Sequence, residues 1–170
     1  MPPSSKLSEQ QECIQRSFGL LAFIVNRHLV DHMRRIALQL DMDFEAAYLY
    51  GTLAHLNILK IYRPGAHPQT VLTEQGMAPV DPMPVRLTDV VQVSGLPRET
   101  VRRKLEWLQT RGKVLRTAEG LWCYDRQGVN DEIIQFTLET IERFLKTADE
   151  MRAMIDKARH KLPIPKEKGS

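Results

Sequence analysis

The feature that most constrains the fold is a glycine and a proline, two residues apart, between two short segments of helical periodicity in residues 85–125. Before them, Thr88 is expected to cap a first short helix, because a threonine hydroxyl accepts backbone N–H groups at a helix N-terminus. Gly95 favours a left-handed or strained turn, and Pro97 suits the start of a second helix, where its missing N–H is not needed. These signals predict a helix, a tight turn and a second helix.

The second helix, expected over residues 97–111, has two chemically distinct faces. Val101, Leu105 and Leu108 recur at helical spacing and are expected to form its buried side. Gly112 is expected to end the helix. The exposed side then carries Arg98, Glu99, Arg102 and Arg103.

A two-stranded hairpin is predicted directly after this helix. Residues 113–116 and 121–124 are rich in strand-forming side chains, and the turn Thr117-Ala118-Glu119-Gly120 separates them. A helix-turn-helix followed by such a hairpin is a winged helix. The expected fold class is therefore mainly α with a small β-hairpin wing, in which the winged helix-turn-helix occupies residues 85–125.

The run GLPRETVRRKLEWLQTRGKV resembles the recognition helix and first wing strand of bacterial winged-helix transcription regulators. Within it, RETVRR is similar to the DNA-reading helix of the cyclic-nucleotide-receptor (Crp/Fnr-like) class of activators. This resemblance covers about forty residues and does not extend to that class's nucleotide-binding β-barrel, because no alternating strands precede it. Two positions depart from the usual pattern. Val91 stands where alanine is common, and Lys104 where an apolar residue is common.

The layout of the whole chain resembles the multiple-antibiotic-resistance (MarR-like) regulators, in which a winged helix lies between N- and C-terminal dimerisation helices. The resemblance implies a cytoplasmic homodimer that regulates transcription by binding double-stranded DNA. A two-fold dimer would read an inverted repeat, with half-sites about 10 bp apart. Regulators with this layout often sense a small molecule, so an effector is also considered.

Groove chemistry assigns roles to the exposed side chains. Arg98, Arg102 or Arg103 can donate two hydrogen bonds to guanine, while Glu99 can accept one from cytosine N4. Alternatively, Glu99 pairs with Arg103, four residues on. The predicted DNA-binding set is Thr88, Arg98, Glu99, Thr100, Arg102, Arg103, Lys104, Lys113 and Arg116.

Phosphate contacts position a protein on DNA without specifying sequence. Thr100, Lys104 and Lys113 are expected to make such contacts, and Arg116, near the wing tip, is expected to reach the backbone or the minor groove. Residues 86–116 hold eight basic and three acidic residues, a net charge of +5, whereas the whole chain carries +3. This concentration indicates a polyanionic partner; the alternative is an ordinary solvated helix surface.

Residues 1–61 are predicted to form N-terminal helices. Lys6 to Leu40 contains no proline and sustains helical periodicity, so one long helix is expected there, in which Gly19 permits a close contact or a slight bend. Residues 41–43 should break and recap the chain before a second helix over residues 44–61. A small winged helix cannot bury the apolar stripe of the first helix, which is therefore expected to pack on another subunit. That stripe comprises Ile14, Phe18, Leu21, Val25, Leu29, Ile36 and Leu40.

Two pairs of side chains in this region have alternative interpretations. His28 and His32 lie one helical turn apart. One interpretation is half of a metal site, and a second is a proton-sensitive contact in a dimer seam. The third is a pair of polar residues at the edge of the apolar stripe. No third ligand has an obvious spacing, so no metal site is predicted. Tyr48 and Tyr50 either line an effector cavity or pack in the core.

The rest of the chain divides into a connector, a helix and a tail. Residues 62–84 contain five of the ten prolines, which predicts a connector that is either mobile or ordered and extended. Residues 126–162 are predicted to form a C-terminal dimerisation helix, capped by Asn130 or Asp131. Residues 163–170 form a tail. The helix carries a near-heptad seam of Ile134, Leu138, Ile141, Leu145, Ala148, Met151, Ile155, Ala158 and Leu162.

Nothing in the sequence indicates an enzyme, a cofactor site or a membrane partner. There is no phosphate-binding glycine loop, nucleophile elbow or closely spaced metal-ligand cluster. Cys13 and Cys123 are too few for a disulfide scaffold, and they fit a reducing cytosol. No apolar run is long enough to cross a membrane. Two rival functions remain: a winged-helix protein-interaction module and a nonspecific architectural DNA binder.

Overall fold

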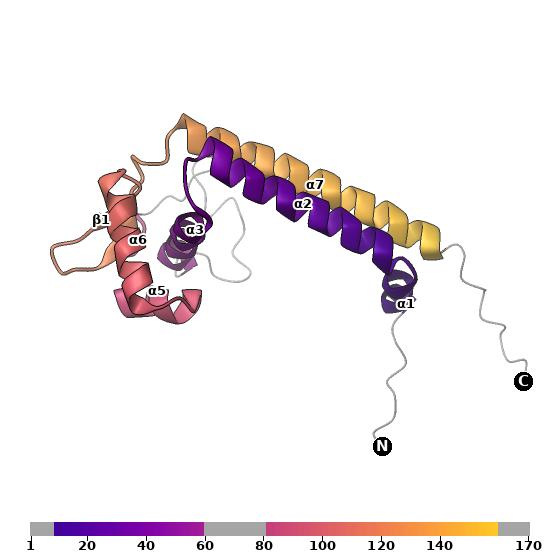
Figure 1. Ribbon diagram of the computed structural model, residues 1–170, viewed down its shortest axis with the longest axis horizontal. Helices are drawn as coiled ribbons and strands as arrows, with labels where there is room; N and C mark the ends of the chain where they lie inside the picture. The colour runs from indigo at the N-terminus through magenta and orange to yellow at the C-terminus, as the bar shows by residue number, and fades with distance from the viewer. Residues whose placement is uncertain (1–8, 60–80, 160–170) are drawn as a thin grey trace, which may run out of the picture. The chain divides into compact units, whose positions relative to one another are not determined.

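The computed structural model describes residues 9–59 and 81–159 (Figure 1). These residues are mostly helical, and the strands among them form one two-stranded antiparallel sheet. The expectation of a mainly α chain with a small β-hairpin is therefore confirmed at that level. The described residues divide into two compact units. One lies within Ile36–Ile134, and the other contains the residues up to Arg35 and from Gln135 onward.

The described part of the unit within Ile36–Ile134 combines three helices with the sheet. Its elements are α3 (Phe44–Leu59), α5 (Leu87–Ser94), α6 (Arg98–Thr110), β1 (Val114–Arg116) and β2 (Trp122–Tyr124). In the sheet, Leu115 pairs with Cys123, and Val85 forms an additional bridge to Trp122. Each predicted strand lies within one residue of its observed position. The predicted helix over residues 97–111 is observed over 98–110.

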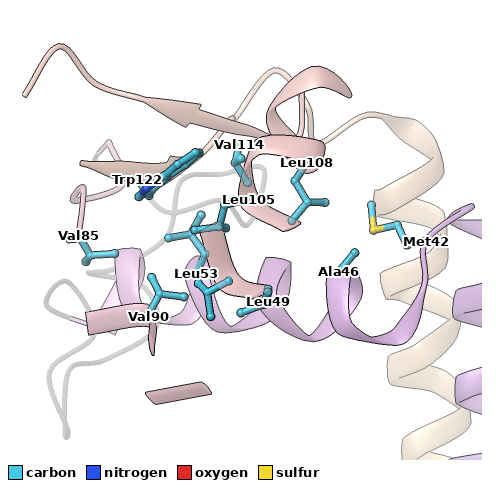
Figure 2. Close-up of a cluster of buried hydrophobic side chains, with 11 residues drawn as sticks. Met42, Ala46, Leu49, Leu53, Val85, Val90, Leu105, Leu108, Val114 and Trp122 are labelled. Atoms are coloured by element: carbon cyan, nitrogen blue, oxygen red, sulfur yellow. The ribbon is translucent and has the colours of Figure 1, made fainter. Parts of the chain in front are cut away.

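The core of this unit lies where α3, α5, α6 and the hairpin meet (Figure 2). Val101, Leu105 and Leu108 are fully buried, as their spacing predicted. They pack in one cluster with Leu49 and Leu53 of α3. Trp122, 1% exposed, brings the hairpin into the same cluster. One apolar cluster therefore holds the exposed side of α6 in a defined position beside the hairpin.

Two glycines have positions that a side chain would not tolerate. Gly95 ends α5 with φ 68° and donates its N–H to the carbonyl of Val91, so the predicted left-handed turn is confirmed. At Gly128 the constraint is space, because an added Cβ would lie 2.1 Å from the carbonyl oxygen of Gly112. Glycine at residue 128 lets the chain leave the hairpin close against the end of α6.

The prediction that Thr88 caps the first helix is wrong. The helix α5 starts at Leu87, so Thr88 already lies inside its first turn. The contact at this end comes instead from Asp89, whose Oδ2 accepts a hydrogen bond from the Arg86 N–H at 3.1 Å. Arginine has no acceptor atom with which to complete a reciprocal capping pair.

Asn57 of α3 is a fully buried polar residue that sequence analysis did not single out. Its Nδ2 donates to the carbonyl oxygen of Met83 at 2.7 Å and to that of Trp122 at 3.3 Å. Its Oδ1 accepts from the Tyr124 N–H at 2.9 Å. The Met83 N–H also donates to the Asn57 carbonyl oxygen at 3.0 Å. This one residue therefore joins α3 to β2 and to the end of the proline-rich connector.

The second unit is built on long helices. Its elements are α1 (Glu9–Arg16), α2 (Phe18–Gln39) and α7 (Asp131–Arg159), the last residues of α2 and the first of α7 belonging to the other unit. The prediction of one continuous helix over residues 6–40 is wrong, because a break at Ser17 separates α1 from α2. Serine and glycine are both weak helix formers, and Ser17 and Gly19 lie at this break.

The predicted breaks at the other ends of these helices are confirmed. Asp41 has a positive φ of 47°, and the Asp43 Oδ1 then accepts from the Ala46 N–H at 2.9 Å to cap α3. At the start of α7, Asn130 rather than Asp131 is the cap, because its Oδ1 accepts from the Ile133 N–H at 3.2 Å. Both caps satisfy backbone donors that have no partner within the helix.

Within the second unit, α2 and α7 lie side by side and run antiparallel (Figure 1). Arg35, 5% exposed, donates to the Thr140 Oγ1 at 3.0 Å and pairs with Glu139 at 3.0 Å. Further along, Arg143 pairs with Asp31 at 2.9 Å. The order of these partners is reversed between the two helices, as an antiparallel pair requires.

Parts of several predictions lie outside the described residues. These are most of the connector over residues 62–84, the tail over residues 163–170, and the ends of the predicted helices at residues 6–8, 60–61 and 160–162. Among residues 9–59 and 81–159, no helix combines the length and the apolar character needed to cross a membrane.

Replacement of Asn57 by alanine is expected to lower the free energy of unfolding by about 3 kcal/mol, because buried backbone groups of three residues lose their hydrogen-bond partner. Chemical denaturation monitored by Trp fluorescence would measure this loss. The control is His55→Ala on the exposed side of the same helix, which should change stability by less than about 0.5 kcal/mol. Equal effects of the two substitutions would show that Asn57 does not join these segments.

Candidate nucleic-acid interface

The exposed side of α6 presents the charged side chains that its periodicity predicted. Arg98, Glu99, Arg102 and Arg103 are all exposed, and the opposite side of the helix is packed on α3 and the hairpin. Thr100 is half-buried. The predicted division of this helix into a buried and an exposed face is therefore confirmed. The ion pairs on the exposed face, however, divide its arginines into two kinds.

Arg102 is paired with two carboxylates of its own helix. Its Nε and Nη2 donate to the two carboxylate oxygens of Glu99 at 2.9 and 2.5 Å. Its Nη1 donates to both oxygens of Glu106, at 2.6 and 2.7 Å. The hydrogen bonds from Arg102 lower the pKa of Glu99, and the hydrogen bonds to both carboxylates raise the pKa of Arg102. The suggestion that Glu99 pairs with Arg103 is wrong, because Arg102, one turn away, engages both its oxygens.

Arg98 and Arg103 are different from Arg102. Within the described part of the chain, neither has a carboxylate at salt-bridge distance or a side-chain hydrogen bond. A guanidinium in this state keeps its donors available to an incoming acceptor. The positive charge that α6 offers to a partner is therefore concentrated at these two positions.

The two lysines of the predicted set have partners inside the protein. The Lys104 Nζ lies 2.5 Å from an oxygen of Asp43 and 3.3 Å from one of Glu45, and the hydrogen bond to Asp43 raises the pKa of Lys104. Its side chain is only 14% exposed. Lys104 thus ties α6 to the start of α3, which accounts for a lysine where similar helices have an apolar residue. The Lys113 Nζ donates to the carbonyl oxygen of Gly128 at 3.3 Å. Phosphate contacts by these lysines stay a prediction.

A groove of about 480 Å³ lies between the starts of α5 and α6 and the hairpin. Four arginines from three segments line it: Arg86 before α5, Arg98 and Arg102 on α6, and Arg116 on β1. Thr88, which does not cap α5, lines this groove as well. Arg116 is placed by Trp122, because its guanidinium lies 5.5 Å from the indole ring centroid.

Sequence analysis missed Arg86 as a site residue, although it contributed to the basic charge of this region. Its position directly before α5 was a usable signal, since a basic side chain at the start of an exposed helix lies beside free backbone N–H groups. The groove also contains one acidic side chain, Glu119, at the hairpin turn. The arrangement suits a ligand with several negative charges spaced along it, such as a phosphodiester chain.

The tyrosines considered for an effector cavity both have contacts inside the protein. The Tyr48 hydroxyl donates to the carbonyl oxygen of Ser94 at 3.2 Å. Tyr50 packs against the core cluster, and burial raises its pKa to about 12. Tyr50 therefore has a packing role, whereas Tyr48 is 51% exposed, and a small-molecule effector stays a prediction.

The predicted apolar stripes of the long helices lie mainly on the surface of their unit. Phe18, Phe23 and Phe144 are 69%, 61% and 60% exposed. Members of both stripes are exposed with them: Ile14, Val25, Leu29, Leu138, Ile141 and Leu145. Only Leu21 of the stripe from Ile14 to Leu29 is buried. Exposed apolar area of this extent is unusual on a monomer.

His28 and His32 lie between α2 and α7. Their rings are stacked with centroids 6.4 Å apart, and the Thr147 hydroxyl lies 3.1 Å from the His28 Nδ1. Among residues 9–59 and 81–159, no group of three or more His, Cys, Asp or Glu side chains is placed to hold a metal ion. Burial, then the nearby Arg35 and His28, lower the pKa of His32, and Asp31 opposes them. Protonation of His32 therefore opposes the packing of these helices.

Searches against protein-family models, curated proteins and solved structures found no match to this chain.

The lowered pKa of His32 gives a pH dependence with a definite sign. Below the ordinary histidine pKa near 6.5, the unfolded chain binds more protons at this residue than the folded chain. Stability should therefore fall as the pH drops from about 6.5 through the folded-state pKa of His32. Thermal unfolding at pH 7.5 and 5.5 would measure the loss.

His32→Gln is expected to reduce that loss, whereas His55→Gln, at an exposed position on α3, should leave it unchanged. If wild type and His32→Gln lost the same amount, His32 would not be its source.

Proposed function

We propose that this protein is a sequence-specific DNA-binding transcriptional regulator that acts as a homodimer, with α6 lying in the major groove. The observation that carries the proposal is the exposed face of α6, where neither Arg98 nor Arg103 has a salt bridge or side-chain hydrogen bond among the described residues, next to a groove lined by four arginines. An α-helix fits the major groove, and positive charge beside it attracts the DNA backbone.

The arrangement of the unit within Ile36–Ile134 supports this proposal. α5, the turn at Gly95, α6 and the β1–β2 hairpin follow one another in the order of a winged helix-turn-helix, and α3 packs against α5, α6 and β2. In such a domain the second helix of the helix-turn-helix reads base edges, and the hairpin forms the wing. The resemblance of the α6 sequence to the recognition helices of bacterial regulators also supports the proposal that α6 binds DNA.

The contacts expected in the complex follow from the chemistry of each side chain. Arg98 and Arg103, whose guanidinium groups have no hydrogen-bond partner among the described residues, can each donate two hydrogen bonds to guanine O6 and N7. Glu99 can accept from cytosine N4. Arg86 and Arg116, which both line the groove, would bind backbone phosphates and set the register of α6 on the DNA.

The exposed apolar face of α2 and α7 supports the homodimer. The same face on a second copy would cover it and bury the phenylalanines that are now exposed, in a helical interface with two-fold symmetry. Two copies of α6 would then be related by a two-fold axis. A regulator of this kind, like the multiple-antibiotic-resistance regulators that its layout resembles, would bind an inverted repeat.

The DNA-binding proposal is tested by selecting bound duplexes from a random library and measuring affinity at two salt concentrations. Wild type should recover an inverted repeat and bind it less tightly at high salt. Arg103→Ala should lose about 1–3 kcal/mol of specific binding and relax the preference at one position of each half-site. Arg116→Ala should weaken binding to all sequences and reduce the salt slope by about one.

Arg152→Ala on α7 is the matched control, since Arg152 is exposed and pairs only with Asp149 among the described residues. It should bind as wild type does. Salt-dependent binding without a motif would favour an architectural DNA binder. Binding to DNA that is weak at both salts would favour a protein-interaction module.

The dimer is tested by placing a charge on the apolar face. Leu138→Glu should convert the dimer to a monomer, because a carboxylate would be buried without a partner in the interface. Sedimentation velocity would measure the change. The control Ala153→Glu adds the same charge at an exposed position of α7 outside the apolar seam and should leave the dimer intact. A wild-type monomer at micromolar concentration would contradict the proposal.

A further inference from the structure

We infer that Arg102 is a positioning residue, which holds the Glu99 carboxylate in place to accept a hydrogen bond from a cytosine base, and that it does not itself read a base. This inference rests on the proposed function and concerns how α6 acquires its base preference. The observation behind it is the pair of bidentate contacts that Arg102 makes with Glu99, three residues before it, and with Glu106, four residues after it.

The geometry of the guanidinium separates Arg102 from its neighbours. The edge formed by Nε and Nη2 is used by Glu99, and Nη1 is used by both oxygens of Glu106. To donate two hydrogen bonds to guanine, Arg102 would have to leave one of these carboxylates. Arg98 and Arg103 have no such partner among the described residues and face no such cost.

The same contacts prepare Glu99 for its role. A carboxylate has about four lone-pair positions, and the side-on contact with Arg102 uses one on each oxygen. The remaining positions are accessible to a ligand, because the Glu99 side chain is 72% exposed. Arg102 restricts the rotamers of Glu99 and offsets the repulsion between its negative charge and DNA phosphates. A free glutamate at an exposed helix position would have neither advantage.

Glu106 completes the arrangement by balancing the charge of Arg102. It lies one turn further along α6, and its Oε1 is 2.6 Å from Nη1 of Arg102. The cluster Glu99–Arg102–Glu106 therefore carries a net charge of −1 on a helix that is otherwise basic on this side. The rival interpretation is that Arg102, which also lines the groove, binds a phosphate in the complex.

The two interpretations predict different changes in DNA selection. If Arg102 positions Glu99, Arg102→Ala should reduce the cytosine preference at one base pair of each half-site from about 10-fold or more to less than about 3-fold, while other positions keep their preferences. Arg102→Lys keeps the charge but lacks the planar fork, so it should lose the same preference. If Arg102 binds a phosphate, Arg102→Lys should retain the wild-type motif, and Arg102→Ala should lose affinity for all sequences.

The double variant Arg102→Ala/Glu106→Gln has the same net charge as wild type and separates positioning from electrostatics. It should still lack the cytosine preference, and its salt slope should equal that of wild type. Restoration of the wild-type motif in this variant would overturn the inference, because it would show that only net charge matters. Arg152→Ala on α7 is again the control for removal of an exposed arginine.

A measurement without DNA tests the contact itself. The titration of the Glu99 carboxyl, followed by NMR in the full chain, should move to higher pH in Arg102→Ala/Glu106→Gln than in Glu106→Gln. An unchanged titration would overturn the inference. If wild type selects no motif, the proposed function fails and this inference fails with it. If wild type selects a motif that Arg102→Ala leaves unaltered, only the inference fails.

Discussion

The buried side-chain amide of Asn57 is the interaction on which the rest of the candidate interface depends. The inner face of β2 and the end of the connector expose backbone groups at the point where they meet α3, and a buried backbone group without a partner is costly. One amide satisfies the carbonyl oxygens of Met83 and Trp122 and the N–H of Tyr124. Trp122 then enters the core, and its ring places Arg116 at the groove.

A second constraint is the distribution of carboxylates around α6. A count of basic residues does not distinguish side chains that have carboxylate partners from those that have none. Lys104 pairs with Asp43 and Glu45, and Arg102 pairs with Glu99 and Glu106. Exposed ion pairs contribute little to stability. Their larger consequence here is to decide which cations remain available to a partner.

In the long helices α2 and α7, polar side chains lie at the contact between the helices and many apolar side chains lie at the surface. Arg35, held by Thr140 and Glu139, and the pair Arg143–Asp31 align α2 with α7 through polar contacts. Their apolar side chains are left largely at the surface of the unit, with Phe18, Phe23 and Phe144 each at least 60% exposed. Apolar area of this kind is stabilised only by removal from water, which supports the proposal of a second copy of the chain.

The sequence by itself determined the local features: the positions of α6, β1 and β2 to within one residue, the buried face of α6, the left-handed turn at Gly95 and the break at residues 41–43. These depend on periodicity and on the conformational preferences of neighbouring residues, which are readable from the chain. Three predictions from the sequence were wrong: the helix cap at Thr88, the continuous helix through Ser17 and the pairing of Glu99 with Arg103. At each of these places several local conformations or pairings have similar energies. Only the tertiary structure decided that Asn57 joins three segments, that Arg86 lines the groove, and that Lys104 has carboxylate partners while Arg103 has none at salt-bridge distance among residues 9–59 and 81–159. Those outcomes depend on which distant groups the packed core brings together, and spacing along one helix carries no information about them.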